Sequence, residues 1–304
     1  MPRKRRYVRQ MKILRSLLYV PAHRDEWVAN AASNGADAVI LDLEDSVPAD
    51  EKEAARAAVS EHADALAAAE TTVTLRVNEV DSDAFYADVE VLGSWADAVV
   101  VPKAESAAEI RSLESILAYV EHRTDVPAPI EIVPLLESPR GVCAVGEIVS
   151  ASDRVAAVGS STSRGGDIQQ SLGLGWSPEG DETLHVRSKV VLEARAAGVE
   201  QILSGIWATV DDEAGLREKA ERQRRFGFTG MQVVHPGQVD AVNDVFTPSA
   251  EELDHYRRLV EAFEREQGGE QGAIRFQGEM VDAATVKRAR RALERAADAS
   301  DEST

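Results

Sequence analysis

From Leu17 onward, short apolar or β-branched runs alternate with longer Ala-rich segments in which apolar residues recur at helical spacing. Alternation of this kind is typical of βα units that build a parallel sheet. The predicted strands are Leu17–Val20, Ala38–Leu43, Thr72–Val77, Ala98–Val101, Glu131–Leu136, Val155–Gly159, Gln201–Ser204 and Gly230–Val234. The predicted helices are Glu26–Ser33, Glu51–Ala69, Asp83–Leu92, Ala107–His122, Gly141–Ser150, Leu184–Ala197, Asp212–Phe226 and Pro236–Val245. Eight alternations favour a (β/α)8 TIM barrel over a doubly wound sheet, which usually stops at about six strands.

The pattern changes after Pro248. It continues as a charged helix, a Gly-bearing stretch, a short apolar segment and an Arg-rich helix, at Glu251–Gln267, Gly268–Gly272, Ile274–Met280 and Ala283–Ala297. This extension is either a lid attached through a glycine hinge or an additional helical element packed on the barrel. We divide the chain into a basic tail at 1–13, a catalytic barrel at 14–247, a C-terminal helical or lid extension at 248–297 and a disordered tail at 298–304.

Composition narrows the class of protein. The 53 acidic against 34 basic residues give a net charge of −19, which would repel a polyanion, so we do not expect nucleic-acid binding. No apolar run reaches the length of about 18 residues that a membrane span requires. Cys143 stands alone and no signal-peptide core follows the basic start, so we expect a cytoplasmic protein.

Two features of the charge stand out. Only seven of the 34 cations are Lys, an acid-rich and Lys-poor balance that resembles proteins adapted to a salt-rich cytoplasm. The alternative is an ordinary acidic bacterial protein. The first 15 residues carry seven cations and no acid, which indicates a polyanion-binding arm, a disordered tail or a true start at Met11.

Polar residues follow most predicted strands at their carboxyl ends, where TIM barrels hold their active sites. They are Asp42, Glu44 and Asp45 after the second strand, Arg76 and Asn78 at the third, Lys103 after the fourth, Glu137 after the fifth, the loop Gly159–Asp167 after the sixth and Val234-His235 at the eighth. We expect all of them at one mouth of the barrel.

Carboxylates gathered at one mouth raise one another's pKa values unless a cation balances them. Oxygen ligands without Cys and with few His suit Mg²⁺, or Mn²⁺, rather than Zn²⁺. We expect Glu137 and Asp167 to bind the metal directly, with Asp42, Glu44 and Asp45 orienting its waters. The alternative for the two ligands is a solvated loop carboxylate, and for Asp45 a helix N-cap or a surface ion pair.

Arg76 stands on an apolar strand, so its guanidinium needs an anionic partner if it points inward. Beside the metal it would suit bidentate recognition of a carboxylate or an oxo acid. The alternative is an arginine that reaches solvent from the end of the strand.

As a set, these motifs resemble the HpcH/HpaI aldolase and citrate lyase β-chain family, and within it the CoA-ester lyases typified by malyl-CoA and citramalyl-CoA lyases. The resemblance extends from about residue 14 to 297 and rests on the order and spacing of the segments rather than on one of them. The matching segments are RSLLYVP (15–21), GADAVILDLEDSV (35–47), LRVN (75–78), VPK (101–103), ESPRG (137–141), GD (166–167), LG (172–173), GFTG (227–230), VHPGQV (234–239) and FQGEMVD (276–282).

The resemblance implies a Mg²⁺-dependent barrel enzyme that makes or breaks a C–C bond between an acyl-CoA and a 2-oxo acid such as glyoxylate or pyruvate. Glu137 and Asp167 match the family's metal ligands, and Arg76 matches the residue that holds the oxo acid. Asp282 matches the general acid/base of a lid that reaches a neighbouring subunit, which implies a homo-oligomer, a trimer or a hexamer. Without the resemblance, Asp282 would be interpreted as a helix N-cap.

The resemblance also implies a set of substrate-binding positions, namely Tyr19, Arg24, Arg76, Glu137, Gly166, Asp167, Val234 and His235. Two features depart from the family pattern. Asn30 stands where the family often has a Lys near CoA, and the loop 160–166 is longer than the usual short form.

Other activities stay open at this point. They are a citrate lyase β chain acting on a carrier-bound substrate, a malyl-CoA thioesterase and a CoA-free class II pyruvate aldolase. A regulatory binder that uses the basic start at 3–12 on RNA or a membrane is a further alternative.

Overall fold

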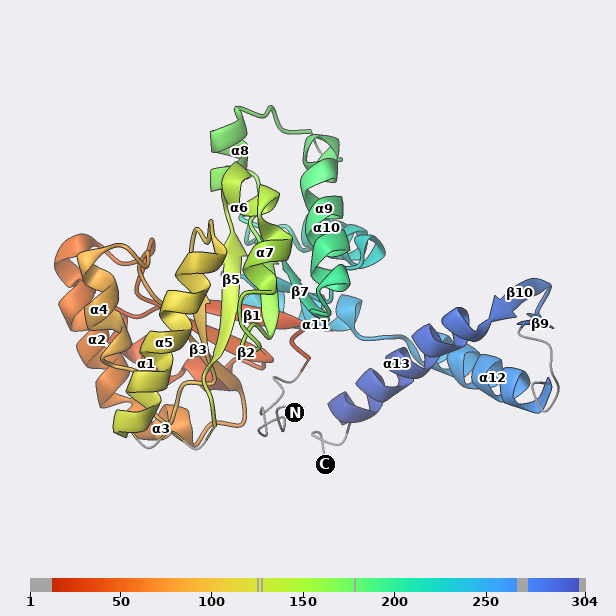
Figure 1. Ribbon diagram of the computed structural model, residues 1–304, viewed down its shortest axis with the longest axis horizontal. Helices are drawn as coiled ribbons and strands as arrows, with labels where there is room; N and C mark the ends of the chain where they lie inside the picture. The colour runs from red at the N-terminus through yellow and green to blue at the C-terminus, as the bar shows by residue number, and fades with distance from the viewer. Residues whose placement is uncertain (1–12, 125, 127, 178, 267–272, 301–304) are drawn as a thin grey trace. The chain divides into compact units, whose positions relative to one another are not determined.

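The computed structural model describes residues 13–124, 126, 128–177, 179–266 and 273–300 (Figure 1). Its centre is a closed barrel of eight parallel strands in sequential order, in which β1 pairs with both β2 and β8. The strands are β1 (Ser16–Pro21), β2 (Ala38–Asp42), β3 (Thr72–Arg76), β4 (Ala98–Val101), β5 (Glu131–Leu136), β6 (Ala157–Ser160), β7 (Gln201–Ser204) and β8 (Gly230–Val233). The predicted (β/α)8 barrel is confirmed.

Helices connect the strands on the outside of the barrel (Figure 1). They are α1 (Asp25–Ala29), η1 (Ala31–Ser33), η2 (Ala49–Glu51), α2 (Lys52–Glu61), α3 (Ala63–Ala67), α4 (Asp83–Val89), α5 (Ala107–Thr124), α6 (Pro139–Cys143), α7 (Val145–Val149), α8 (Asp167–Leu172), η3 (Asp181–Thr183), α9 (Leu184–Ala196), α10 (Glu213–Phe226), η4 (Pro236–Gln238) and α11 (Val239–Phe246). Three predicted helices are each broken in two, at Asn30, His62 and Ala144. Helix α8 was not predicted.

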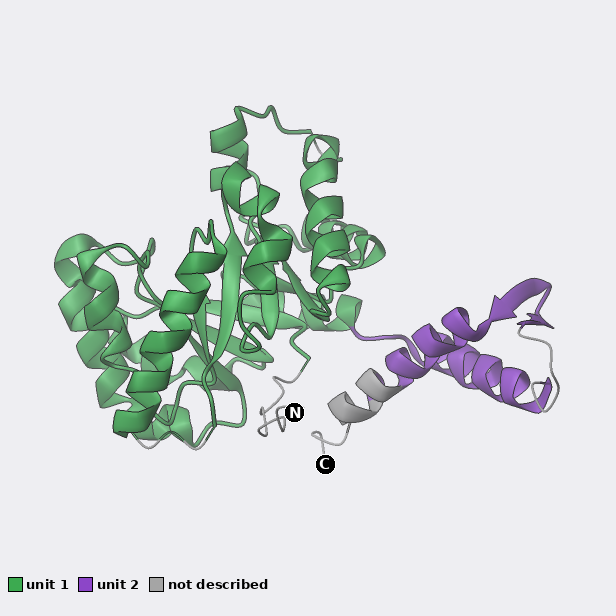
Figure 2. Ribbon diagram, viewed as in Figure 1, with its two compact units in different colours: residues 1–246 green, residues 247–304 purple. Residues whose placement is uncertain are grey.

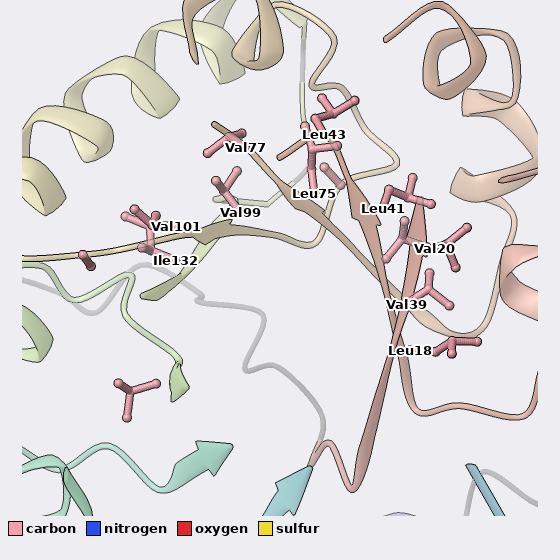
Figure 3. Packing of buried hydrophobic residues seen from close by; sticks show 14 of the residues in the cluster. Leu18, Val20, Val39, Leu41, Leu43, Leu75, Val77, Val99, Val101 and Ile132 are labelled. Atoms are coloured by element: carbon pink, nitrogen blue, oxygen red, sulfur yellow. The ribbon is translucent and has the colours of Figure 1, made fainter. Parts of the chain in front are cut away.

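Alternation along the strands divides the apolar core into an inner and an outer part. Because successive side chains of a strand point to opposite faces, Leu17 lies inside the barrel while Leu18 packs outward. Figure 3 shows the outward set on β1 to β5, which packs against the helices. The inner cluster consists of Leu14, Leu17, Ala38, Ile40, Ala98, Val100, Val133, Leu135, Ala157 and Leu203.

The same alternation places charged residues in the layer above the inner apolar cluster. Asp42 follows the inward Ile40 by two positions, and Glu137 follows the inward Leu135 by two. Strand register aligns Asp42 with Arg76 on the neighbouring strand. The carboxyl end of the barrel is therefore closed by polar groups that face one another.

A second compact unit begins at Thr247 (Figure 2). It consists of α12 (Ala250–Glu266), the antiparallel pair β9 (Ala273–Phe276) and β10 (Glu279–Asp282), and α13 (Ala283–Ser300). Its own apolar cluster comprises Leu259, Ala262, Phe263, Ile274, Val281, Val286 and Ala289. The predicted segment Ile274–Met280 is this hairpin.

Three predicted segments lie outside the described residues. They are the basic start at 1–12, the glycine-bearing stretch at 268–272 and the chain end at 301–304. Helix α13 continues to Ser300, three residues into the stretch for which a disordered tail was expected. None of the described helices has the length and apolarity of a bilayer span.

Candidate active site

A buried ion pair between two adjacent strands forms the floor of the site. Arg76 on β3 donates from Nε to Oδ1 of Asp42 and from Nη2 to Oδ2, both at 2.7 Å. Its Nη1 lies 3.0 Å from Oε2 of Glu44, and its guanidinium lies 4.8 Å from the ring centre of Tyr19. Arg76 is only 7% exposed, so the alternative of an arginine that reaches solvent is wrong.

Asp42 is the counter-ion of Arg76. Its Oδ1 also accepts the N–H of Glu44 at 2.9 Å, and its Oδ2 accepts both the N–H and the hydroxyl of Ser46. Burial alone would raise the pKa of Asp42, but the hydrogen bonds and the charge of Arg76 hold it below its usual value. Because the protein itself engages both oxygens, the structure does not match the expected role of orienting metal-bound waters.

Glu44 lies between two cations. Its Oε1 accepts from Nζ of Lys103 at 2.9 Å, and its Oε2 faces Arg76 and accepts the N–H of Asp45 at 2.8 Å. Burial raises the pKa of Glu44 despite both cations. Asp45 is exposed, with Oδ1 3.7 Å from Nζ of Lys103. Its side chain therefore forms a surface ion pair, one of the two alternatives that the sequence left open.

Glu137 stands directly after β5 and is 8% exposed. Its Oε2 accepts the N–H of Lys103 at 2.9 Å, while Oε1 accepts no hydrogen bond from the described residues. Burial raises the pKa of Glu137 to about 7; Arg76 and the Lys103 N–H oppose this rise, whereas the charges of Glu44 and Asp167 add to it. Asp167 is therefore close enough for its charge to act on Glu137.

Asp167 is the first residue of α8 and is half-buried, with Gly166 at the N-cap position. The preceding loop turns through a hydrogen bond from the Gly166 N–H to the carbonyl of Ser163 at 3.1 Å. The hydroxyl of Ser163 donates to the carbonyl of Ile206 at 2.9 Å. The long Ser- and Gly-rich loop is thus fastened to the loop that follows β7.

The donor set of this mouth fits a hard divalent cation. Asp42, Glu44, Glu137 and Asp167 bring four carboxylates against the two cations Arg76 and Lys103. In the described part of the chain, no three His, Cys, Asp or Glu side chains form a metal-binding group. The candidate ligands that the sequence predicted are the pair Glu137 and Asp167. Mg²⁺ commonly binds through one or two carboxylates and completes its octahedron with water and substrate oxygens. These two residues could hold it in that way.

Three residues of the mouth had no assigned role in the sequence analysis. Lys103 contacts Glu44 and Glu137, and its position at a strand end was the signal that could have identified it. Gln232, buried on the inner face of β8, accepts the hydroxyl of Tyr19 at 2.6 Å, and burial raises the pKa of Tyr19. Lys52 donates from Nζ to the carbonyl of Leu43 at 2.7 Å and so supports the loop that carries Glu44.

Other predicted residues are exposed, and in the described part of the chain none of them contacts the acidic cluster. Arg24, at the N-cap position of α1, is exposed. Val234 and His235 are exposed after β8, the strand that pairs with β1, and Nδ1 of His235 accepts the N–H of Gly237. Asn30 is also exposed and donates from Nδ2 to the carbonyl of Glu26.

Asp282 belongs to the second compact unit, and its side chain is exposed. Its Oδ1 accepts the N–H and the hydroxyl of Thr285 at 2.8 and 2.9 Å. It therefore caps the start of α13, as its sequence context alone indicated, and its other oxygen, Oδ2, accepts no hydrogen bond from the described residues.

Comparison with known proteins places this arrangement in a family. A profile of the HpcH/HpaI aldolase/citrate lyase family matches residues 15–236. Citrate lyase subunit beta of Escherichia coli is 32% identical over 95% of both chains, and L-malyl-CoA/beta-methylmalyl-CoA lyase of Cereibacter sphaeroides is 29% identical over 90% of this chain and 92% of its own.

Solved structures agree with these sequence matches. The crystal structure of CitE from Mycobacterium tuberculosis, in complex with magnesium, acetoacetate and coenzyme A, has a TM-score of 0.73 and 31% identity, covering 94% of this chain and 98% of its own. The citrate lyase beta subunit of the same organism, complexed with oxaloacetate and magnesium, has a TM-score of 0.61 and 31% identity, with coverage of 77% and 96%. The chain belongs to the HpcH/HpaI aldolase/citrate lyase family.

Proposed function

We propose that this protein is a Mg²⁺-dependent CoA-ester lyase that cleaves or forms a C–C bond between an acyl-CoA and a 2-oxo acid, either glyoxylate or pyruvate. The observation that carries the proposal is the buried Glu137, which follows β5 and lies within reach of the charges of both Arg76 and Asp167. A carboxylate pair for a metal and a cation for a substrate carboxylate would then be neighbours. The relatives named malyl-CoA/beta-methylmalyl-CoA lyase and the CitE complex with magnesium and coenzyme A support this interpretation.

Glu137 and Asp167 would hold the metal and set its position. When bound there, Mg²⁺ supplies a Lewis acid for the hydroxyl and carboxylate oxygens of the substrate. Both residues leave room for substrate oxygens because together they fill only two coordination positions. Glu137 is buried, so water would screen its attraction to the metal less than at an exposed site.

Arg76 would bind the carboxylate of the oxo acid. A guanidinium carries five N–H groups; Asp42 accepts two of them, and Nη1 lies 3.0 Å from Glu44, so both terminal nitrogens keep N–H groups that Asp42 does not hold. Two such donors match the two oxygens of a carboxylate. Charge-assisted donors of this kind also stabilise the negative charge that develops as the C–C bond breaks.

In the cleavage direction, the substrate hydroxyl passes its proton to water and becomes the carbonyl of the oxo acid. The electron pair of the C–C bond passes to the thioester, forming an enolate, and a proton then returns to its α-carbon. We assign that proton transfer to Asp282 because its Oδ2 is not engaged by the cap. We propose that Asp282 acts in the site of a neighbouring subunit of a trimer or hexamer.

Coenzyme A would lie along the rim formed by the ends of β1, β6 and β8. Arg24 offers an exposed guanidinium after β1, and Gly166, Val234 and His235 follow β6 and β8. Tyr19 lies deeper, where its hydroxyl donates to Gln232. Asn30 supplies no charge at the position where relatives often have a Lys. We place the enzyme in a cytoplasm of high salt, consistent with its charge of −19.

The test is an assay in 2 M KCl with Mg²⁺, supplying malyl-CoA, β-methylmalyl-CoA and citramalyl-CoA separately and detecting oxo acid and free thiol. We expect oxo-acid release that EDTA abolishes and Mg²⁺ restores. Glu137→Gln and Asp167→Asn should reduce it at least about 100-fold, while Glu147→Gln on α7 serves as the matched control. Thiol release without oxo acid would instead identify a thioesterase.

The second candidate is a citrate lyase β chain, favoured by the 32% identity to the E. coli subunit of that name. Such a chain would act on a substrate bound to an acyl-carrier protein. It would be inactive on all three CoA esters but active on a citryl thioester of the carrier. Release of oxaloacetate from the carrier thioester, without cleavage of any of the three CoA esters, would identify the citrate lyase β chain.

A further inference from the structure

Lys103 connects the ends of four strands at the mouth of the barrel. Its backbone N–H donates to Oε2 of Glu137, and its Nζ donates to Oε1 of Glu44 at 2.9 Å and to Oε1 of Glu79 at 3.0 Å. Lys103 itself follows β4, while these acids follow β5, β2 and β3. Its backbone has a φ of 46°, in the left-handed region that non-glycine residues seldom adopt. Such strain persists only where surrounding contacts hold it.

The ammonium of Lys103 fixes the position of the Glu44 carboxylate. One oxygen of Glu44 faces Lys103 and the other faces Nη1 of Arg76 at 3.0 Å. Glu44 is 5% exposed, so without Lys103 it would have Arg76 as its nearest remaining cation. Buried carboxylates frequently bind an arginine through both oxygens. The Asp45 N–H holds only Oε2 of Glu44, so Oε1 would be free to turn toward Arg76 once Lys103 is removed.

We propose that Lys103 is a positioning residue for oxo-acid binding: it holds one oxygen of Glu44 and thereby keeps the N–H groups of Arg76 that Asp42 does not hold available for the substrate carboxylate. The inference rests on the proposed function, since it needs an oxo acid at Arg76. The backbone of Lys103 contributes a second effect, because its N–H occupies Oε2 of Glu137 and leaves Oε1 for a metal.

The two effects predict different responses from metal and substrate. Removing the ammonium takes a positive charge away from the acidic mouth, so Mg²⁺ binding should not weaken. Oxo-acid binding should weaken, because Glu44 then competes for Arg76 and the local potential becomes more negative. A merely structural role for Lys103 would weaken both together.

The experiment measures two affinities separately by isothermal titration calorimetry: Mg²⁺ alone, and glyoxylate or pyruvate at saturating Mg²⁺. Lys103→Met removes the charge at nearly constant volume, and Lys103→Gly removes it while relieving the positive φ and keeping the N–H. Lys103→Arg retains the charge. Lys189→Met, on α9 away from the mouth, is the matched control for the loss of one lysine.

We expect Lys103→Met and Lys103→Gly each to weaken oxo-acid binding about tenfold, with Mg²⁺ affinity within about twofold of wild type or tighter. Lys103→Arg should recover most of the loss. Unchanged oxo-acid affinity in Lys103→Met would overturn the inference. Equal losses of affinity for Mg²⁺ and for the oxo acid would also overturn it, and so would a loss of oxo-acid affinity in Lys103→Met that Lys103→Gly does not share. If the wild-type protein binds Mg²⁺ but no oxo acid, the proposed function itself fails. This outcome differs from a failure of the inference because it is seen in the wild-type protein without any variant.

Discussion

Arg76 and Asp42 are joined side by side across β3 and β2 by two hydrogen bonds of 2.7 Å inside the barrel. Replacing Asp42 by Asn would leave the buried guanidinium without its main counter-charge. We expect Asp42→Asn to lower the free energy of unfolding by about 3–5 kcal/mol, as for other broken buried pairs, measured by urea denaturation. Glu213→Gln, which breaks an exposed pair with Arg217, should change it by less than about 0.5 kcal/mol. Equal changes in the free energy of unfolding for the two substitutions would contradict the claim that the buried ion pair contributes more than the exposed one.

Gly141 allows two loops of the mouth to approach closely. A Cβ at this position would lie 2.3 Å from the carbonyl oxygen of Ala104 and so force α6 away from the loop after β4. We expect Gly141→Ala to destabilise the fold by about 1–3 kcal/mol and to weaken Mg²⁺ binding, because Glu137 directly precedes this helix. Thermal denaturation and Mg²⁺ titration measure the two effects. Gly175→Ala, where a Cβ meets nothing within 4 Å, is the control and should leave both nearly unchanged.

Lys219 makes stability depend on pH. Its Nζ donates to the carbonyl of Ile206 at 2.6 Å, and burial, together with the charge of Arg187, lowers its pKa from 10.5 to about 7. Between these two values the unfolded chain holds a proton that the folded chain has released, so stability rises with pH in this window. The unfolding free energy of wild type minus that of Lys219→Met should therefore increase from pH 7 to 9, by at most about 1.4 kcal/mol per unit. A difference that stays flat would show that the lysine keeps its proton in the folded state.

Asp282→Asn separates the acid/base role of this residue from its capping role. An Asn side chain can still accept from Thr285 and start α13, but it cannot exchange a proton. We expect turnover to fall about 100-fold or more, with the affinity for acyl-CoA within about threefold of wild type. Steady-state kinetics and calorimetry measure the two quantities. Asp254→Asn on α12, which changes another exposed carboxylate of the same unit, should leave turnover unchanged, whereas normal turnover in Asp282→Asn would remove the assignment.

The barrel could be predicted because its strands are buried on both faces and therefore appear as apolar runs, as in Ala98–Val101 and in residues 132–136 of β5. Helix breaks could not, since the apolar period continues across single residues such as Asn30 and His62. Helix α8 escaped prediction because it is six residues long and has one buried side chain, Ile168, so it shows no repeating apolar face.

Position at the strand ends predicted which charged residues gather at the mouth, but not which of them pair. The pairing of Asp42 with Arg76 depends on the register between β2 and β3, which no local pattern contains. The left-handed backbone of Lys103 is likewise invisible in its side chain, since nothing in the tripeptide VPK indicates a positive φ. Gln232 was overlooked because a single amide on an apolar strand resembles an edge position rather than an inward one.

The origin of the charged groups divides the barrel into two functional halves. Asp42 stands on β2, Arg76 on β3 and Glu44 in the loop after β2. The long loop 160–166 and α8, in contrast, follow β6. Under the proposed function, the residues that would bind a small carboxylate come from one half, and the segment that departs from the family pattern belongs to the other. Exchanging the loop 160–166 would then change the surroundings of the acyl group while leaving Arg76 and its two acidic partners in place.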